Sequence, residues 1–130
     1  MRKVDNETRL KIYNKYNGYC AYCGVKLSYN KMQVDHFLPV RKAHYLETEQ
    51  MKDAMEVDNS LEDMNQLSNL MPSCARCNRW KSTLQIEQFR NAIKNLIVGL
   101  NRDSSQYRMA KDYGLILESG TNVTFYYEKY

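Results

Sequence analysis

The strongest hydrophobic pattern lies between residues 86 and 100, where apolar side chains recur at intervals of three and four. This spacing places them on one face of a helix. The face consists of Ile86, Phe89, Ile93, Leu96, Ile97 and Leu100. Residues 82–85 (Ser-Thr-Leu-Gln) have the order of a capping box, so we expect the helix to begin there. Residues 103–113 predict a further short helix, which Gly114 closes.

The N-terminal part predicts one helix and one strand. Asp5 or Asn6 can cap a first helix, which Asn17-Gly18 would end. Residues 31–36 then alternate apolar and polar positions, with β-favouring side chains at 32 and 34. This alternation predicts a strand that ends at Asp35-His36.

The middle and the end of the chain predict further elements of both kinds. Residues 45–57 have the pattern of a helix, and 69–73 form an extended segment that leads into a short helix near Cys74. Residues 115–117 and 123–127 predict a terminal β-hairpin across the turn at 119–122. Helices combined with short strands of this kind indicate an α+β fold.

Length and composition indicate one small globular domain. The 130 residues can form a single core, so we take 1–130 as one domain. No apolar run has the length of a signal peptide, and none reaches the roughly 20 residues of a membrane span. We therefore expect a cytoplasmic protein without a membrane partner.

Four cysteines form two chelating pairs, Cys20-x2-Cys23 and Cys74-x2-Cys77. In a reducing compartment such thiols bind metal more often than they form disulfides. Two pairs complete a tetrahedral zinc (Zn²⁺) site with no open position, which predicts a structural role for the ion. The alternative is four thiols without metal. A redox role would need a βαβ pattern that we do not find.

Polar residues of catalytic character occur at fixed places around these pairs. They are Asp35-His36 at the end of the predicted strand, Asn69 five residues before the second pair, and Asn78 and Lys81 after it. This combination resembles the HNH endonucleases. Their pattern of a cysteine pair, Asp-His, Asn-Leu, and Cys-Asn followed by Lys is matched at every element, over roughly residues 18–82. Residues 83–130 would form a helical and hairpin extension.

The resemblance implies a ββα-metal core with a four-cysteine zinc knuckle. Its parts would be a strand ending at Asp35-His36, a second strand carrying Asn69 and a helix carrying Asn78. The resemblance also assigns Asn69 the task of holding the His36 ring, so that the correct nitrogen faces the attacking water.

The residue types fit phosphodiester hydrolysis. His36 can take a proton from water, while Asp35 and Asn78 offer hard oxygen ligands to a catalytic Mg²⁺ or Mn²⁺. Each residue taken alone also has an ordinary structural explanation, such as a turn or a cap. Only their joint occurrence at this spacing favours the HNH interpretation.

Two features depart from the family pattern. Asn78 stands where the family name has a histidine, although its amide oxygen can still bind a hard cation. The 32 residues between His36 and Asn69 form a long insertion. It holds most of an acidic segment, and acids beside a phosphate-binding face would repel DNA unless they point away.

Charge is unevenly distributed along the chain. Segment 47–63 carries seven acids and one lysine, which gives it a charge of −6. Because the whole chain has a net charge of +4, the rest of the chain has a charge of +10. Basic side chains near the motif could neutralise DNA phosphates without reading the base sequence. The residues predicted to make these phosphate contacts are Arg41, Lys42, Arg76, Arg79 and Lys81. Trp80 could stack on a base, but we expect it to be buried behind the knuckle.

The first functional hypothesis is a nonspecific or nicking DNA endonuclease of a phage, defence or mobile-element system, acting in a bacterial or phage-infected cell. The alternative is an HNH-like zinc module that binds a protein through segment 47–63, for example a phage-encoded inhibitor (an anti-CRISPR) of a host CRISPR or other defence nuclease. A third possibility is a DNA-binding zinc module without catalysis, but it leaves Asp35, His36 and Asn78 unexplained.

Overall fold

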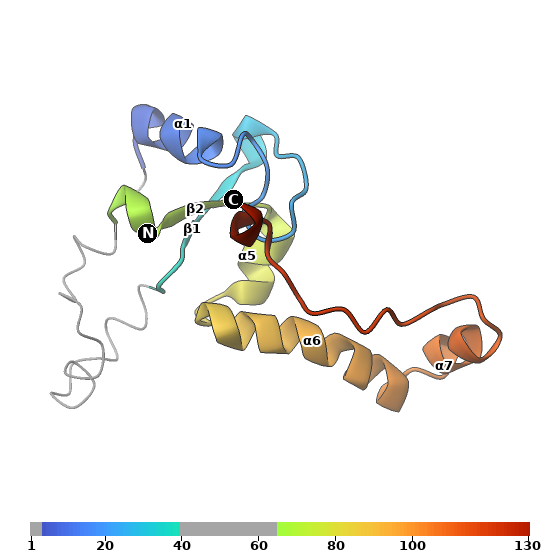
Figure 1. Ribbon diagram of the computed structural model, residues 1–130. Coiled ribbons are helices and arrows are strands. Elements are labelled where there is room, and N and C mark those ends of the chain that lie inside the picture. Colours follow the sequence, from blue (N-terminus) through green and yellow to red (C-terminus); the bar gives the residue numbers. More distant parts are fainter. Residues whose placement is uncertain (1–3, 40–64) are drawn as a thin grey trace, which may run out of the picture.

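The computed structural model describes residues 4–39 and 65–130, and these residues form a small α+β protein (Figure 1). They contain four α-helices and one two-stranded antiparallel sheet. In chain order the elements are α1 (Asn6–Asn14), β1 (Gln33–His36), β2 (Leu70–Ser73), α5 (Ala75–Lys81), α6 (Ile86–Asp103) and α7 (Ser105–Asp112). Short 3-10 turns lie at Tyr29–Lys31, Leu67–Asn69 and Tyr126–Lys129.

Helix α1 is formed by the expected signals. The Asp5 side chain accepts a hydrogen bond from the Thr8 amide at 2.7 Å and so caps the helix. After the helix, Asn17 and Gly18 adopt positive φ angles of 57° and 86°. This left-handed pair turns the chain toward the first cysteine pair, but the helix itself ends at Asn14, three residues before the predicted stop at Asn17-Gly18.

The sheet places the Asp-His dipeptide beside the segment that leads to the second cysteine pair. Asp35 pairs with Met71 and His36 pairs with Leu70. The strand therefore ends at His36, as the alternation predicts. Asn69 lies in the turn just before β2 instead of within the strand.

The first knuckle is built into the core by backbone hydrogen bonds on two sides. The Ala21 amide donates to Pro72 O of β2 at 2.9 Å. The C-terminal turn approaches from another side, where the Tyr126 and Tyr127 amides donate to Tyr22 O and Ala21 O at 3.0 and 2.8 Å. The last residues of the chain therefore pack on the first cysteine pair, as the red segment in Figure 1 shows.

The predicted C-terminal hairpin is wrong. Residues 115–125 are described, and they form no strand. Leu115 and Leu117 are 80% and 88% exposed, so no core face draws them into a sheet. Phe125 instead stacks on Phe89 of α6, with ring centroids 5.3 Å apart. The segment returns from α7 to the knuckle as an irregular connection because its apolar end is buried there.

The capping box of α6 also differs from the expected one. Gln85 is the N-cap, and its side chain and that of Gln88 each accept from the other residue's backbone. Ser82 instead ends α5, with a φ of 47°. The sequence predicts a capping box formed by Ser82 and Gln85, whereas the observed box is formed by Gln85 and Gln88, three residues later. Helix α7 begins after Ser104, which caps it, and Gly114 follows it with a φ of 77°.

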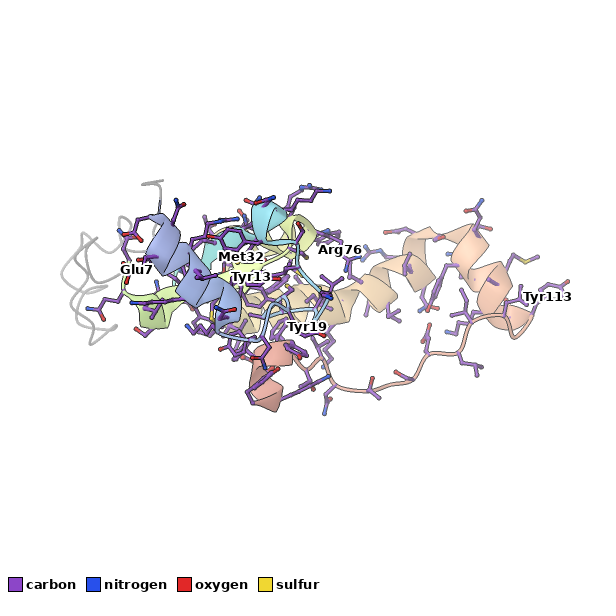
Figure 2. The ribbon with its side chains drawn as sticks, turned by 90° about the horizontal axis from the view of Figure 1, so that it is seen from above. Glu7, Tyr13, Tyr19, Met32, Arg76 and Tyr113 are labelled. Atoms are coloured by element: carbon purple, nitrogen blue, oxygen red, sulfur yellow. The ribbon has the colours of Figure 1, made fainter. Side chains whose placement is uncertain are left out.

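The second half of α6, α7 and the residues after it form an arm, which we define as residues 94–118. The arm leads away from the sheet in Figure 1. Figure 2 shows Tyr113 at the end of the arm that is distant from Arg76 and the rest of the core. The predicted helix at 45–57 and the acidic segment 47–63 lie outside the described residues. Among the described helices, none has the length and apolar character needed to cross a bilayer.

Candidate functional site

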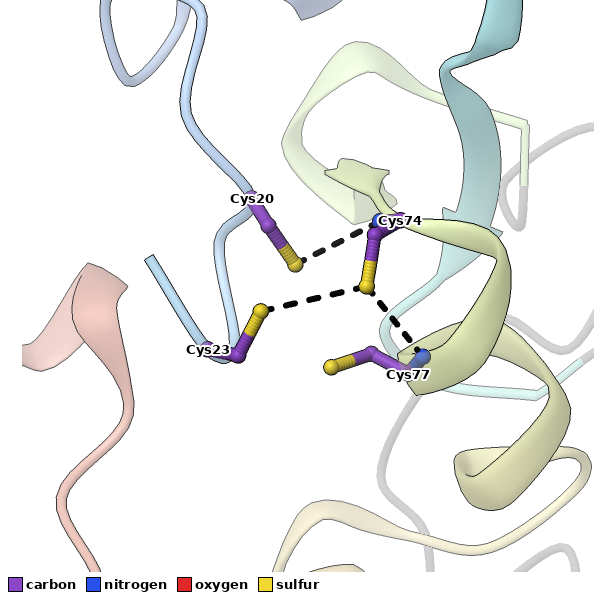
Figure 3. A group of neighbouring side chains, drawn as sticks. All are labelled: Cys20, Cys23, Cys74 and Cys77. Atoms are coloured by element: carbon purple, nitrogen blue, oxygen red, sulfur yellow. Dashed lines mark hydrogen bonds between the residues drawn. The ribbon is translucent and has the colours of Figure 1, made fainter. Parts of the chain in front are cut away.

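The two cysteine pairs meet in one cluster (Figure 3), as their spacing predicts. All four sulfurs lie within 4.8 Å of one another. Tetrahedral coordination with Zn–S bonds of about 2.3 Å separates sulfurs by about 3.8 Å. The Sγ atoms of Cys23 and Cys74 are 3.8 Å apart. The cluster can therefore hold a metal ion such as zinc.

Backbone amides around the cluster favour thiolate sulfur. The Cys74 amide donates to Cys20 Sγ at 3.4 Å, and the Cys77 amide donates to Cys74 Sγ at 3.3 Å. A hydrogen bond from the Cys77 thiol is the main cause that lowers the pKa of Cys20, and the same bond raises the pKa of Cys77. The two amide donors favour the thiolate form of Cys20 and Cys74, which is the form of cysteine that binds metal.

Arg76 lies against this cluster. Its hydrogen bond to Cys23, together with the negative sulfurs of Cys74 and Cys77, raises the pKa of the guanidinium. Four thiolates around a divalent ion carry a net charge of about −2. Arg76 therefore partly neutralises the negative charge of the cluster. The sequence predicts Arg76 as a phosphate contact and does not predict this second role.

Asp35 is buried and is held by two donors that bind the same oxygen. The residue is 5% exposed. The Tyr22 hydroxyl donates to Oδ2 at 2.5 Å, and Lys81 Nζ lies 3.1 Å from Oδ2. Burial raises the pKa of the Asp35 carboxyl, while the charge of Lys81 and the bond from Tyr22 oppose that rise. Among the described residues no group binds Oδ1, so the two carboxylate oxygens differ in their partners.

The expectation that Lys81 contacts phosphate is corrected by its position. Its side chain is fully buried, at 0% exposure. Besides the ion pair with Asp35, Nζ donates to His36 O at 2.9 Å. Lys81 faces inward because it follows Cys77, also buried, by one turn of α5. It ties the helix to the end of β1 and cannot reach nucleic acid.

The His36 ring is held by a residue other than the expected one. His36 Nε2 lies 2.9 Å from Asn65 Oδ1. The Asn69 carboxamide instead accepts from the Leu38 amide at 2.7 Å and donates to Leu38 O at 3.2 Å. Asn69 thus fixes the backbone two residues after His36, and Asn65 orients the ring. The sequence carries no motif that would single out Asn65.

Asn78 lies on α5 one turn before Lys81. Its side chain is half-buried, and no described residue hydrogen-bonds its carboxamide. Since Lys81 contacts both residues of the Asp35-His36 dipeptide, the α5 segment that carries Asn78 meets the end of β1 at this junction. A free amide oxygen here can act as a ligand to a hard cation.

The outer surface of α5 presents several side chains to solvent. Arg76 and Arg79 are exposed. Trp80 is 52% exposed, so the expected burial of this ring is wrong. Arg41 and Lys42 lie outside the described residues. Of the five basic residues predicted to contact phosphate, the two that lie exposed in the described part of the chain are therefore Arg76 and Arg79 on α5.

No family model, curated protein or solved structure matches the chain. Its function is therefore inferred from the residues of the site.

Proposed function

We propose that this chain is a metal-dependent endonuclease of the HNH type, which hydrolyses phosphodiester bonds in DNA. The observation that carries the proposal is the junction between β1 and α5. There Asp35 and His36 end a strand beside the helix that bears Asn78, and the cysteine cluster lies at the start of that helix. A structural zinc in the cluster would brace this geometry without entering the chemistry.

His36 would act as the general base. In the tautomer that donates from Nε2 to Asn65, the lone pair lies on Nδ1. Nδ1 would then take the proton of the attacking water. The two hydrogen bonds between the Asn69 carboxamide and the Leu38 backbone support this role, because they hold the backbone after His36 in place.

Asp35 and Asn78 would hold the catalytic cation. Oδ1 of Asp35 and the carboxamide oxygen of Asn78 are hard donors that suit Mg²⁺ or Mn²⁺. When bound, such an ion supplies Lewis-acid stabilisation of charge on the phosphate and the leaving oxygen. The two side chains come from different elements, so the Lys81 bridge between α5 and β1 would also set their separation.

DNA would approach along the exposed side of α5. Arg79 offers a positive charge there, and the half-exposed Trp80 offers an aromatic face. Neither contact reads base sequence by itself, which fits nonspecific or nicking activity.

Cleavage of supercoiled plasmid tests the proposal. Zinc-loaded protein with Mg²⁺ or Mn²⁺ is expected to produce nicked or linear DNA, and His36→Ala is expected to lower the rate by about 100-fold or more, the contribution of a general base. His44→Ala, which changes the only other histidine, serves as the matched control and should cleave normally. Intact plasmid with both metals would refute the proposal.

The second candidate is an HNH-like zinc module that binds a protein partner. One observation favours it, because the internal ion pair with Lys81 already neutralises Asp35. A site retained for structure and not for catalysis would have the same appearance. Charge reversal across residues 47–63 would then abolish biological activity, whereas His36→Ala would leave it intact. The opposite pattern would exclude the binding module.

A further inference from the structure

Tyr22 is a buried polar group that neither a zinc knuckle nor nucleic-acid binding requires. It stands between the two cysteines of the first pair, yet it is only 2% exposed. Residues inside such a loop need only make the turn that directs both sulfurs at the ion. The inward ring of Tyr22 therefore indicates a further role.

The ring is fixed in one orientation by aromatic neighbours. Its edge-to-face contacts reach Phe89, Phe125 and Tyr127, with centroid distances of 5.7, 5.8 and 6.4 Å. Its backbone is also held, since Tyr22 O accepts from the Tyr126 amide. A ring packed in this way can present its hydroxyl in only one direction, which is toward Asp35.

The hydroxyl donates to the carboxylate. An ionised carboxylate can only accept, so the proton of this bond belongs to the phenol. It binds Oδ2, the oxygen that Lys81 also contacts. Both protein partners thus bind one oxygen and leave the other uncommitted within the described residues. Two donors on Oδ2 fix the rotation of the carboxylate about its last bond.

We propose that Tyr22 is a positioning residue of the cleavage site: it holds the Asp35 carboxylate so that Oδ1 is presented to a divalent cation. This inference rests on the proposed function, since it requires Asp35 to be a cation ligand. It adds a physical link between the two centres. One partner of Oδ2 lies inside the first cysteine pair and the other follows the second pair, so the cluster that holds the knuckles also orients the carboxylate.

Mn²⁺ binding, followed by electron paramagnetic resonance on zinc-loaded protein, tests the inference. Tyr22→Phe keeps the ring and removes only the hydroxyl, and we expect Mn²⁺ affinity to fall by about 10-fold or more, as for other groups that orient a metal ligand. Tyr13→Phe is the matched control, because its hydroxyl donates to Leu27 O at 3.0 Å, in a separate contact. Wild-type affinity in Tyr22→Phe would overturn the inference.

Cleavage kinetics separate positioning from general damage. Tyr22→Phe should need more Mn²⁺ for half-maximal cleavage and should recover the wild-type rate at saturating metal. A rate that stays low at every metal concentration would indicate structural damage and overturn the inference. Mn²⁺ binding without cleavage by the wild type would refute only the proposed function, since the affinity comparison still decides the role of Tyr22. A wild type that binds no Mn²⁺ would refute both.

A measurement on the wild type covers the case in which Tyr22→Phe does not fold. The Tyr22 hydroxyl proton, shielded and bound to a carboxylate, should give a slowly exchanging proton resonance. We expect this resonance to shift as Mg²⁺ is added and to saturate with the cation site. A resonance that saturating Mg²⁺ leaves unmoved would overturn the inference.

Discussion

The core around the cysteine cluster and the arm differ in which side chains they bury. Around the knuckles, Lys81 and Asp35 are 0% and 5% exposed. On the arm, Tyr113, Leu115 and Leu117 are 76%, 80% and 88% exposed. In the first region charged groups are buried because each has a partner far away in the chain. In the second, apolar groups are exposed because few elements pack against them (Figure 2).

The two regions therefore depend on different kinds of interaction. The Lys81–Asp35 pair joins β1 to α5 through two residues that are 46 positions apart in the sequence. The arm is held by nearby contacts: Glu118 accepts from Asn101 and Tyr107, each at 2.8 Å, and pairs with Lys111 at 3.2 Å. Loss of a single long-range partner should destabilise the whole core. Loss of a local contact should change only the arm.

The largest effect is expected from loss of a cluster ligand. A structural zinc supplies on the order of 10 kcal/mol of apparent binding free energy, which is comparable to the whole stability of a small domain. Cys77→Ser should therefore abolish the cooperative unfolding transition of the core, measured by circular dichroism with heating. Chelation of metal from the wild type should have the same effect.

The matched change on the arm is Met109→Ser, which alters a side chain that is 53% exposed. Its thermal transition should stay close to that of the wild type, since surface substitutions usually change stability by less than about 0.5 kcal/mol. Equal losses in Cys77→Ser and Met109→Ser would contradict the division into two regions.

The next largest effect is expected from loss of the buried Lys81 ammonium group. Lys81→Met leaves Asp35 as an uncompensated buried charge, and breaking such a pair from one side costs about 3–5 kcal/mol. Lys94→Met is the control, because Lys94 is exposed on the arm. Urea unfolding of both variants measures the difference. A Lys81→Met protein as stable as Lys94→Met would show that the ion pair contributes no net stability.

Much of the fold follows from local signals that the structure confirms. The Asp5 cap, the strand that ends at His36 and the apolar face of α6 are each set by neighbouring residues. The cysteine cluster also follows from spacing, since chelating pairs leave little freedom in where their sulfurs lie. These features need no knowledge of the tertiary arrangement.

The remaining features depend on contacts that spacing does not encode. Residues 115–117 and 123–127 predict a hairpin, but Phe125 packs on Phe89 and the hairpin does not form. Lys81 looks like a surface cation until its partner Asp35 is known. Tyr22 carries one weak signal, an aromatic ring between two chelating cysteines. Each case was decided by burial against a distant element, which overrides local pattern.

The smallest effect is expected at the seam between α6 and the C-terminal turn. Arg90 donates to both carboxylate oxygens of Glu128, at 2.7 and 2.9 Å. These bonds are the main cause that holds the pKa of Glu128 below its ordinary value of 4.5. A carboxylate with a lowered folded pKa stabilises the protein above its unfolded pKa and loses that contribution as pH falls through the folded value. The seam should therefore weaken below about pH 4.5.

Glu128→Gln isolates this contribution, which for a partly exposed pair is about 0.5–1 kcal/mol. At pH 7 the variant should be less stable than the wild type by that amount, and the difference should shrink as the pH falls below 4.5 and through the lowered folded pKa of Glu128. Arg90→Met should reduce the same pH-dependent difference, because it removes the main donor. Urea unfolding at pH 7 and at a series of lower pH values measures it. If Glu128→Gln kept the full acid sensitivity of the wild type, then a carboxylate elsewhere in the chain would control it, and the Arg90–Glu128 pair would not.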